Sequence, residues 1–327
     1  MKLLIFIAQP YVVAGNLKAN YKTILHYISL AQEAKASYII FPKETLTGEN
    51  LGALNEQMDF RNDAAKLRLN LQKINNANLK IVFSDDYDIC GCHIKPQYIG
   101  ISYLGKNIQV HFGGSAVFNS DGKIASQAKY FTEDFIKITF DTETQNFSNN
   151  DKPTENFDKI KFIYHTLHFG IKEFLKQKNI QKITVGLSGG IDSAVAAALF
   201  VDVLGPENVL LINMPTKFNS DLTKSLAQNI AKKLNAKFLT IPIDNVVDKT
   251  LETLKNNNFE PSQIISENIQ ARDRSSRILA AFSAAFGGAF SANGNKAELC
   301  VGYTTFYGDL AGALAPLGDL WKYQVYK

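Results

Sequence analysis

The residues whose types and spacing point most clearly to chemistry form a short loop in the second half of the chain. The loop consists of Gly186, Leu187, Ser188, Gly189, Gly190, Ile191, Asp192 and Ser193. It follows a predicted strand and opens an alanine-rich predicted helix. Glycines let backbone N–H groups approach an anion closely, and the N-terminus of a helix favours negative charge. Ser188 and Ser193 add hydroxyl donors, so we expect this loop to hold a phosphate group.

Three catalytic motifs compete for the loop. A P-loop requires Gly and Lys where Ile191 and Asp192 stand, so that motif is excluded. The nucleophile elbow of serine hydrolases, G-x-S-x-G, fits locally, but its His must follow the Ser, and all five histidines precede Ser188. The pyrophosphate loop of ATP pyrophosphatases, S-G-G-x-D-S, matches at every position. The remaining alternative is a glycine-rich turn with an Asp at the helix cap.

Asp192 adds a carboxylate to the expected phosphate site. Two negative groups repel one another unless a cation lies between them. Asp192 therefore predicts a Mg²⁺ ion that bridges the protein and the pyrophosphate.

Arginine is scarce in this chain, which makes each arginine informative. Lys and Arg together number 35, and only five of these are Arg: Arg61, Arg68, Arg272, Arg274 and Arg277. A guanidinium group offers a planar fork that lysine cannot copy. Because three of the five fall within 272–277, this segment is a candidate site. The alternative is a solvated helix face.

The bulk composition excludes several classes of protein. A chain of 327 residues with 46% apolar content suits two domains with sizeable cores. The net charge of +4 argues against a nucleic-acid or membrane surface built on bulk charge. The three cysteines, Cys90, Cys92 and Cys300, form no disulfide framework and suit a reducing cytoplasm. Cys90 to His93 lack further zinc ligands nearby, so a plain loop is expected there.

The first half of the chain begins with a β-α-β pattern. We expect a helix at about 20–35, short strands with glycine breaks from 98 to 140, and strands at 3–8, 38–41 and 79–83. The apolar run at 3–8 is thus predicted to be a buried strand and not a signal peptide. The polar residues 146–157 are the predicted linker, which gives domains at 1–145 and 158–327.

The second half alternates helices and strands. We expect strands at 182–187, 209–214 and 237–241, with helices at 159–178, from the loop to 204, and at 220–234. The apolar run at 278–292 is too short to span a bilayer. The alternation predicts a doubly wound parallel sheet, whose ligands bind at the carboxyl ends of its strands. The loop at 186–193 lies at such an end.

Beyond the loop, the second half resembles the glutamine-dependent NAD synthetases. The resemblance runs from about Lys159 to Tyr326 and rests on several separated motifs. They are 186–193, 214–215, 267–274, 293–298, 302–309 and 316–322. The resemblance implies an ATP-pyrophosphatase domain with an adenine nucleotide alpha hydrolase-like fold at 158–327. It also implies a shortened nitrilase-like α/β sandwich of the glutaminase type at 1–145.

In that family ATP adenylates the nicotinate carboxylate of deamido-NAD and releases pyrophosphate, and ammonia drawn from glutamine then displaces AMP. The resemblance implies a homodimeric ligase that uses ATP, Mg²⁺, deamido-NAD, and ammonia or glutamine. It implies ATP-binding roles for Gly186, Leu187, Ser188, Gly189, Gly190, Ile191, Asp192, Ser193, Met214 and Asn293. It implies substrate-binding roles for Asn268, Arg272, Arg274, Lys296, Glu298, Tyr303, Thr304, Thr305, Phe306 and Asp309. Asp192 and Glu298 are the implied Mg²⁺ ligands.

The first half resembles the glutaminase domain only at its two ends, and the middle of that domain is missing. Lys43 stands where the family has its catalytic Glu, and Glu44 is one place late. Cys90 only faintly matches the setting of the family's nucleophile, and no segment matches the family's Lys-Leu-Pro block. Glu44 and Cys90 are therefore remnants. We expect no glutaminase activity, with free ammonia as the nitrogen donor.

Two alternatives to this ligase remain. Family members continue past the position of Tyr326, so we expect an incomplete synthetase domain, and a catalytically defective remnant that still binds adenine nucleotide is one alternative. The other is a different ATP pyrophosphatase joined to a class II amidotransferase domain. That arrangement needs Cys at position 2, where Lys2 stands.

Overall fold

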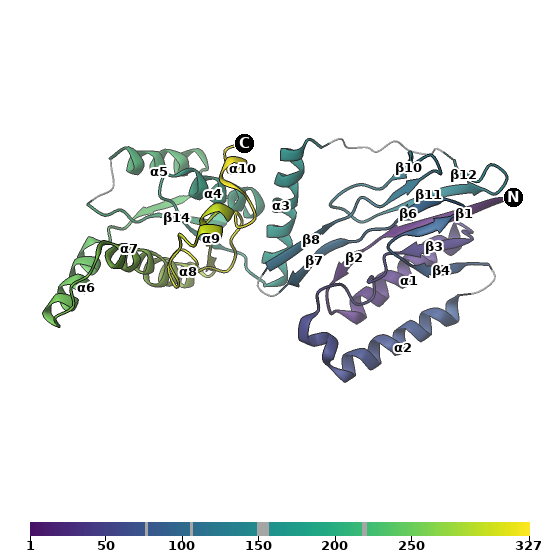
Figure 1. Ribbon diagram of the computed structural model, residues 1–327, viewed down its shortest axis with the longest axis horizontal. Helices are drawn as coiled ribbons and strands as arrows, with labels where there is room; N and C mark the ends of the chain where they lie inside the picture. Colours follow the sequence, from purple (N-terminus) through teal and green to yellow (C-terminus); the bar gives the residue numbers. More distant parts are fainter. Residues whose placement is uncertain (76–77, 105–106, 149–156, 218–220) are drawn as a thin grey trace. The chain divides into compact units, whose positions relative to one another are not determined.

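The computed structural model describes residues 1–75, 78–104, 107–148, 157–217 and 221–327 (Figure 1). The chain forms two compact units, Met1–Gly170 and Ile171–Lys327, and the division falls within helix α3 (Lys159–Gln177). The predicted linker begins with strand β12 (Asn146–Phe147). Residues 149–156 of this linker lie outside the described residues.

The first unit is built on a five-stranded sheet in the order β12-β11-β1-β3-β4. Strands β1 (Lys2–Gln9), β3 (Tyr38–Phe41) and β4 (Lys80–Phe83) run parallel, and β11 (Asp134–Asp141) runs antiparallel to β1. The strands predicted at the start of the chain are confirmed. Helices α1 (Leu17–Glu33) and α2 (Met58–Ile74) lie along one side of this sheet (Figure 1).

Two smaller sheets complete the first unit. One is antiparallel, in the order β10-β9-β6-β5, with β5 (Tyr87–Ile89), β6 (Cys92–Lys95), β9 (Ala116–Phe118) and β10 (Ile124–Gln127). The other joins β2 (Tyr11–Val13), β7 (Ile99–Leu104) and β8 (Asn107–Phe112), and a short 3₁₀ helix, η1, covers Gly52–Glu56. The expected short strands between 98 and 140 are thus confirmed.

Alternation along β1 explains how these layers hold together, since successive side chains of a strand point to opposite faces. Ile5 and Ile7 pack into a core that contains Ile94 of the antiparallel sheet. Phe6 and Ala8 pack into a second core with residues of α1 and α2. The order of layers is therefore helices, five-stranded sheet, antiparallel sheet.

The second unit contains a parallel four-stranded sheet in the order β15-β14-β13-β16. Its strands are β13 (Ile183–Gly186), β14 (Val209–Asn213), β15 (Lys237–Thr240) and β16 (Ala289–Phe290), and each neighbouring pair is parallel. The β-branched residues of β13 are buried, as a central strand requires. The predicted parallel α/β sheet is confirmed.

Helices connect and flank these strands (Figure 1). They are α4 (Ile191–Leu204), η2 (Pro206–Asn208), α5 (Asp221–Lys233), α6 (Asp244–Asn256), α7 (Gln263–Arg272), η3 (Asp273–Leu279), α8 (Ala280–Phe286), α9 (Lys296–Val301) and α10 (Lys322–Val325). The segment η3 is π-helical and continues directly from α7 into α8. Within the described ranges, no helix has both the length and the apolar character needed to cross a membrane.

Candidate active site

The loop singled out in the sequence links the end of β13 to the start of α4, with Gly190 as the helix N-cap. Gly189 has φ +91°, and a Cβ built there would lie 2.4 Å from the carbonyl oxygen of Thr223. Only glycine fits such a position, because L side chains avoid this φ and the backbone oxygen cannot easily move. The tight turn therefore depends on Gly189.

The two serine hydroxyls stabilise the loop from within. The amide of Ser188 donates to Ser193 Oγ at 3.2 Å, and Ser193 Oγ donates to the carbonyl of Gly190 at 3.0 Å. The amide of Gly190 in turn donates to Ser188 Oγ at 3.2 Å. The loop is thus pre-shaped, which spares a bound anion the cost of ordering it.

A cavity of about 410 Å³ opens at the carboxyl ends of β13, β14 and β16. Twelve of the predicted site residues line it: Gly186, Leu187, Ser188, Gly190, Asp192, Ser193, Met214, Arg274, Asn293, Glu298, Tyr303 and Asp309. The other predicted residues do not: Gly189, Ile191, Asn268, Arg272, Lys296, Thr304, Thr305 and Phe306. The cavity therefore brings together most of the expected ATP-binding set and part of the expected substrate set.

Asp192 and Glu298 line the same cavity and are connected through Asn295, which is 1% exposed. Asn295 Nδ2 donates to Asp192 Oδ1 at 3.3 Å, and the Asn295 amide donates to Glu298 Oε2 at 3.0 Å. Asn295 also caps α9, since its side chain accepts from the amides of Ala297 and Glu298. One buried residue therefore holds both carboxylates, Asp192 through its side-chain amide and Glu298 through its backbone N–H.

The ammonium group of Lys322 forms an ion pair with Asp192 Oδ2. Burial opposes the charge on Lys322, but the hydrogen bond to Asp192 and the charges of Asp192 and Glu298 raise its pKa. Lys322 is thus held as a cation beside the two carboxylates. Neither the motif spacing nor the resemblance predicted this pair, because Lys322 lies far along the chain from Asp192.

The arginine cluster divides into three different roles. Arg274 enters the cavity, where Nε donates to the carbonyl of Met214 at 3.2 Å. Burial lowers the pKa of Arg274, although nearby acidic groups oppose the shift and an arginine keeps its proton. Arg277 instead forms a bidentate pair with the buried carboxylate of Asp273, at 2.5 and 2.8 Å. Arg272 is exposed, and its Nε donates to the carbonyl of Phe306 at 3.1 Å.

The segment from Tyr303 to Asp309 packs against helix α7 through polar contacts. Thr305 Oγ1 donates to Asn268 Oδ1 at 2.7 Å, and the Thr305 amide donates to Asp309 Oδ1 at 2.6 Å. Tyr303 and Phe306 are each 75% exposed. Lys296 points elsewhere, with Nζ 5.0 Å from the centre of the Trp321 ring. These contacts position the segment at the rim of the cavity.

Two asparagines hold the start of the loop. Asn293 Nδ2 donates to the carbonyl of Gly186 at 3.0 Å, and Asn213 Nδ2 donates to the carbonyl of Leu187 at 2.7 Å. Asn213 Oδ1 is buried without a hydrogen-bond partner in the described part of the chain. Sequence reasoning missed Asn213, although a polar residue that ends the apolar strand β14 is a usable signal.

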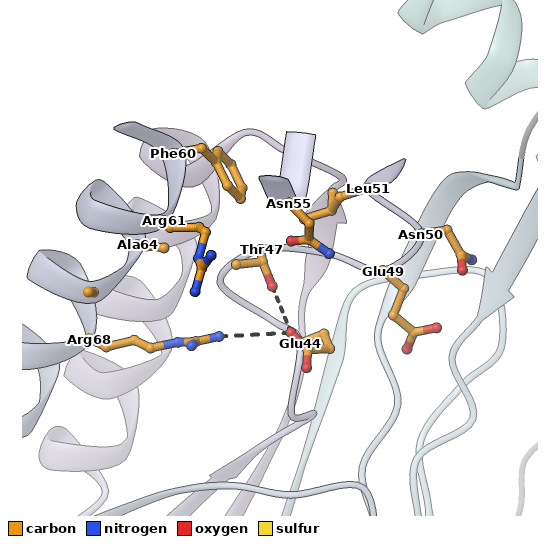
Figure 2. Close-up of a pocket in the computed structure, with 12 residues that line it drawn as sticks. Glu44, Thr47, Glu49, Asn50, Leu51, Asn55, Phe60, Arg61, Ala64 and Arg68 are labelled. Atoms are coloured by element: carbon orange, nitrogen blue, oxygen red, sulfur yellow. Dashed lines mark hydrogen bonds and ion pairs between the residues drawn. The ribbon is translucent and has the colours of Figure 1, made fainter. Parts of the chain in front are cut away.

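In the first unit, the residues predicted to be remnants of a glutaminase site, Glu44 and Cys90, line no common cavity in the part of the chain that the structure describes. Glu44 accepts a hydrogen bond from Thr47 Oγ1 at 2.7 Å and lies 3.9 Å from Arg68 (Figure 2). Lys43 is exposed, and its amide donates to Asp85 Oδ1 at 3.1 Å. Cys90 is exposed in the turn between β5 and β6, and it lines neither of the two cavities that Glu44 lines.

Comparisons with known proteins agree with this geometry. The family model for NAD synthase matches residues 163–327, just over half of the chain. The glutamine-dependent NAD(+) synthetase of Synechocystis sp. is 35% identical over 233 residues, which are 70% of this chain and 41% of that protein. The corresponding synthetase of Acinetobacter baylyi is 30% identical over 275 residues, which are 79% of this chain and 50% of that protein. The chain thus spans half or less of the length of these curated relatives.

Solved structures show the same fold. The glutamine-dependent NAD+ synthetase of Acinetobacter baumannii, solved with adenosine diphosphate, has a TM-score of 0.83 and covers 100% of this chain and 81% of its own. The two sequences are 21% identical, so this comparison shows the fold alone. From the family model together with the shared motifs, the chain belongs to the NAD synthase family.

Proposed function

We propose that the second unit carries out an ATP-dependent amidation that makes NAD. The nicotinate carboxylate of deamido-NAD attacks the α-phosphorus of ATP, and the bond to the β-phosphate breaks to release pyrophosphate. Ammonia then attacks the carbonyl carbon, the bond to AMP breaks, and the nitrogen loses a proton. The observation that carries this proposal is the one cavity in which the phosphate loop, Asp192, Glu298 and Arg274 meet.

The loop at 186–193 receives the phosphates of ATP that leave as pyrophosphate. Gly189 keeps the backbone free of side-chain atoms, and the N-terminus of α4 favours the negative charge. The lining of the cavity also contains apolar residues that suit a purine ring, namely Ile212, Met214 and Leu279. Arg274, already charged and half-buried, offsets part of the negative charge of the two substrates.

Asp192 and Glu298 are the residues that would hold Mg²⁺. Their carboxylate oxygens are the ligands that this ion prefers. The ammonium of Lys322, which lies on Asp192, shows that a positive charge is stable beside them. When bound, Mg²⁺ neutralises charge between the protein and the pyrophosphate. Lys322 must release Asp192 for this to happen, and it then becomes available to an anionic substrate.

We propose residues 1–145 as a shortened glutaminase-type domain that hydrolyses no glutamine, so that free ammonia is the nitrogen donor. Hydrolysis by this route needs a Cys nucleophile, a Glu base and a Lys near the oxyanion. Lys43 replaces the Glu, and Glu44 is tied to Thr47 and faces Arg68. Glutamine-driven NAD formation that is lost in Cys90→Ala would contradict this part of the proposal.

We further propose that the protein is a cytoplasmic homodimer. Its three cysteines are all free, which suits a reducing compartment. Near the end of the chain, large apolar side chains are more than 60% exposed, namely Val301, Tyr303, Phe306, Tyr307, Tyr323 and Tyr326. Exposed apolar surface favours association. Sedimentation analysis is expected to give a dimer with a tendency to aggregate, and a well-behaved monomer would exclude it.

A protein that binds ATP without catalysis is the second candidate. The ion pair between Lys322 and Asp192 favours it, because that pair occupies a carboxylate that Mg²⁺ needs. The high exposure of Tyr303 and Phe306 favours it too, since these residues are expected at the nicotinate side.

The test compares Glu298→Gln with Glu260→Gln, a matched change at an exposed residue that does not line the cavity. ATP binding is measured with and without Mg²⁺, and NAD formation is measured with deamido-NAD and ammonium chloride. We expect Glu298→Gln to lose at least about tenfold of the Mg²⁺-dependent ATP affinity, since an anionic ligand is removed. ATP binding without NAD formation in the unmodified protein would favour the second candidate, and no ATP binding would exclude both.

A further inference from the structure

A second cleft, of about 600 Å³, lies in the first unit between helix α2 and the segment 44–55 that follows β3 (Figure 2). It is separate from the phosphate loop and shares no residue with the cavity of the second unit. Its lining combines two arginines, two glutamates, two asparagines and several apolar residues. These are Glu44, Thr47, Gly48, Glu49, Asn50, Leu51, Asn55, Phe60, Arg61, Ala64, Ala65 and Arg68.

Arg61 is a charged group of this cleft whose side chain has no partner among the described residues. Its guanidinium points from α2 into the cleft (Figure 2). Its side chain makes no hydrogen bond or ion pair with any described residue. Arg68 lies seven residues later on the same face of the helix and is already 3.9 Å from Glu44. Arg61 therefore offers five donors to whatever enters.

Of the two carboxylates of the cleft, Glu44 already has partners. It accepts from Thr47 Oγ1 at 2.7 Å and faces Arg68. Burial raises the pKa of Glu49, and the Tyr98 hydroxyl opposes this shift. Arg61 is thus the charged group of the cleft without a partner in the described part of the chain, and a guanidinium suits an anion. A doubly charged anion is disfavoured, because two glutamates line the same cleft.

The apolar residues of the lining indicate the chemical nature of the rest of the ligand. Phe60 lies next to Arg61, and Leu51 lies beside Asn55 (Figure 2). Ala64 and Ala65 of α2 add methyl groups to the lining. Apolar surface of this kind binds a hydrocarbon body, whereas it offers nothing to a bare inorganic ion.

The use of arginine in the sequence supports the same reading. The chain has only five arginines among 35 basic residues, and three of them are at 272–277. The other two, Arg61 and Arg68, both line this one cleft. In a chain whose basic residues are almost all lysine, two arginines in one cleft indicate a need for the planar guanidinium group, which binds a carboxylate with two parallel hydrogen bonds.

We propose that this cleft binds a small organic monocarboxylate, with its carboxylate on the guanidinium of Arg61 and its apolar body against Phe60 and Leu51. Such a site acts by binding alone, and it is independent of the reaction proposed for the second unit.

The experiment titrates the whole protein with butyrate and, as controls, with n-butylamine and inorganic phosphate, by calorimetry and by saturation-transfer NMR. Three variants are compared with the unmodified chain: Arg61→Gln, Arg61→Lys and Lys73→Gln, the last being a basic residue of α2 that does not line the cleft. Arg61 is exposed, so its replacement is expected to leave the melting temperature unchanged.

We expect butyrate to bind saturably and n-butylamine not to bind. Arg61→Gln is expected to weaken butyrate at least about tenfold, equivalent to 1.4 kcal/mol, while Lys73→Gln leaves it unchanged. Arg61→Lys is expected to fall between, because it keeps the charge and loses the fork. The proposal is overturned if butyrate does not bind, if its binding is the same in Arg61→Gln, or if phosphate binds more tightly than butyrate in an Arg61-dependent way.

Discussion

Replacing one glycine of the phosphate loop, and then its neighbour, tests whether the loop has the backbone that the site requires. At Gly189 the φ of +91° and the 2.4 Å approach of the Thr223 carbonyl oxygen both oppose a side chain. At Gly190 the φ is −79°, and the nearest atom to an added Cβ is Ser188 Oγ at 3.4 Å. The two positions are adjacent but differ completely in what a methyl group would meet.

The expected cost of Gly189→Ala follows from these two terms. A left-handed conformation costs a non-glycine residue roughly 1–2 kcal/mol, and forcing an extra methyl into packed surroundings costs roughly 1–3 kcal/mol. We expect a loss of about 2–5 kcal/mol in the free energy of unfolding of the second unit, together with loss of ATP binding. Gly190→Ala is expected to cost below about 1 kcal/mol, since its backbone is ordinary extended chain.

Urea unfolding, followed by circular dichroism, measures the loss of stability. Calorimetric titration with ATP and Mg²⁺ measures the loss of ATP binding. For a unit of this size a loss of 1 kcal/mol lowers the melting temperature by roughly 2–4 °C, so the two variants are easily separated. Equal stability and equal ATP affinity in the two alanine variants would refute the reasoning about the loop.

Three further predictions concern single side chains. Lys322→Met is expected to tighten Mg²⁺ binding to the free protein by up to about fivefold, because a partly exposed ion pair with Asp192, worth up to roughly 1 kcal/mol, no longer competes. Calorimetry with Lys255→Met, a change at an exposed lysine, is the control. Arg274→Lys is expected to weaken the binding of ATP or deamido-NAD by roughly 1–3 kcal/mol. Because the substitution also removes the Nε bond to Met214, the melting temperature is measured alongside, and an unaltered affinity in titration would exclude a ligand contact. Burial lowers the pKa of His111 from 6.5 to about 4, so folding excludes its proton. The free energy of unfolding is therefore unaffected by protonation of His111 above pH 6.5, and it decreases by up to about 3 kcal/mol as the pH drops to 4. Urea titrations at both pH values should show this decrease, and His111→Gln should make it smaller.

The phosphate loop could be predicted from the sequence because each local signal agrees. A buried β-branched strand, a run of glycines and an alanine-rich helix together allow one arrangement, and the parallel sheet directs the strand end into the site. The same agreement made the strands β1 and β3 predictable from their apolar runs.

Features that depend on distant contacts were missed. Helix α2 was not predicted, because its pattern is mostly polar and only Ala64 and Leu71 are buried. The π-helical segment η3 was not predicted either. It contains both Arg274 and Arg277, which the sequence presents as one cluster but which bond different partners, Met214 and Asp273. The pair of Lys322 with Asp192 joins residues that no local pattern connects.

The amidation proposed for the second unit is tested by quantifying the products of one reaction. The protein is supplied with ATP, Mg²⁺, deamido-NAD and ammonium chloride, and NAD, AMP and pyrophosphate are quantified together. We expect all three products to appear in equal amounts and the omission of Mg²⁺ to stop their formation. ATP consumed to ADP and phosphate, or AMP released without NAD, would contradict the proposed amidation.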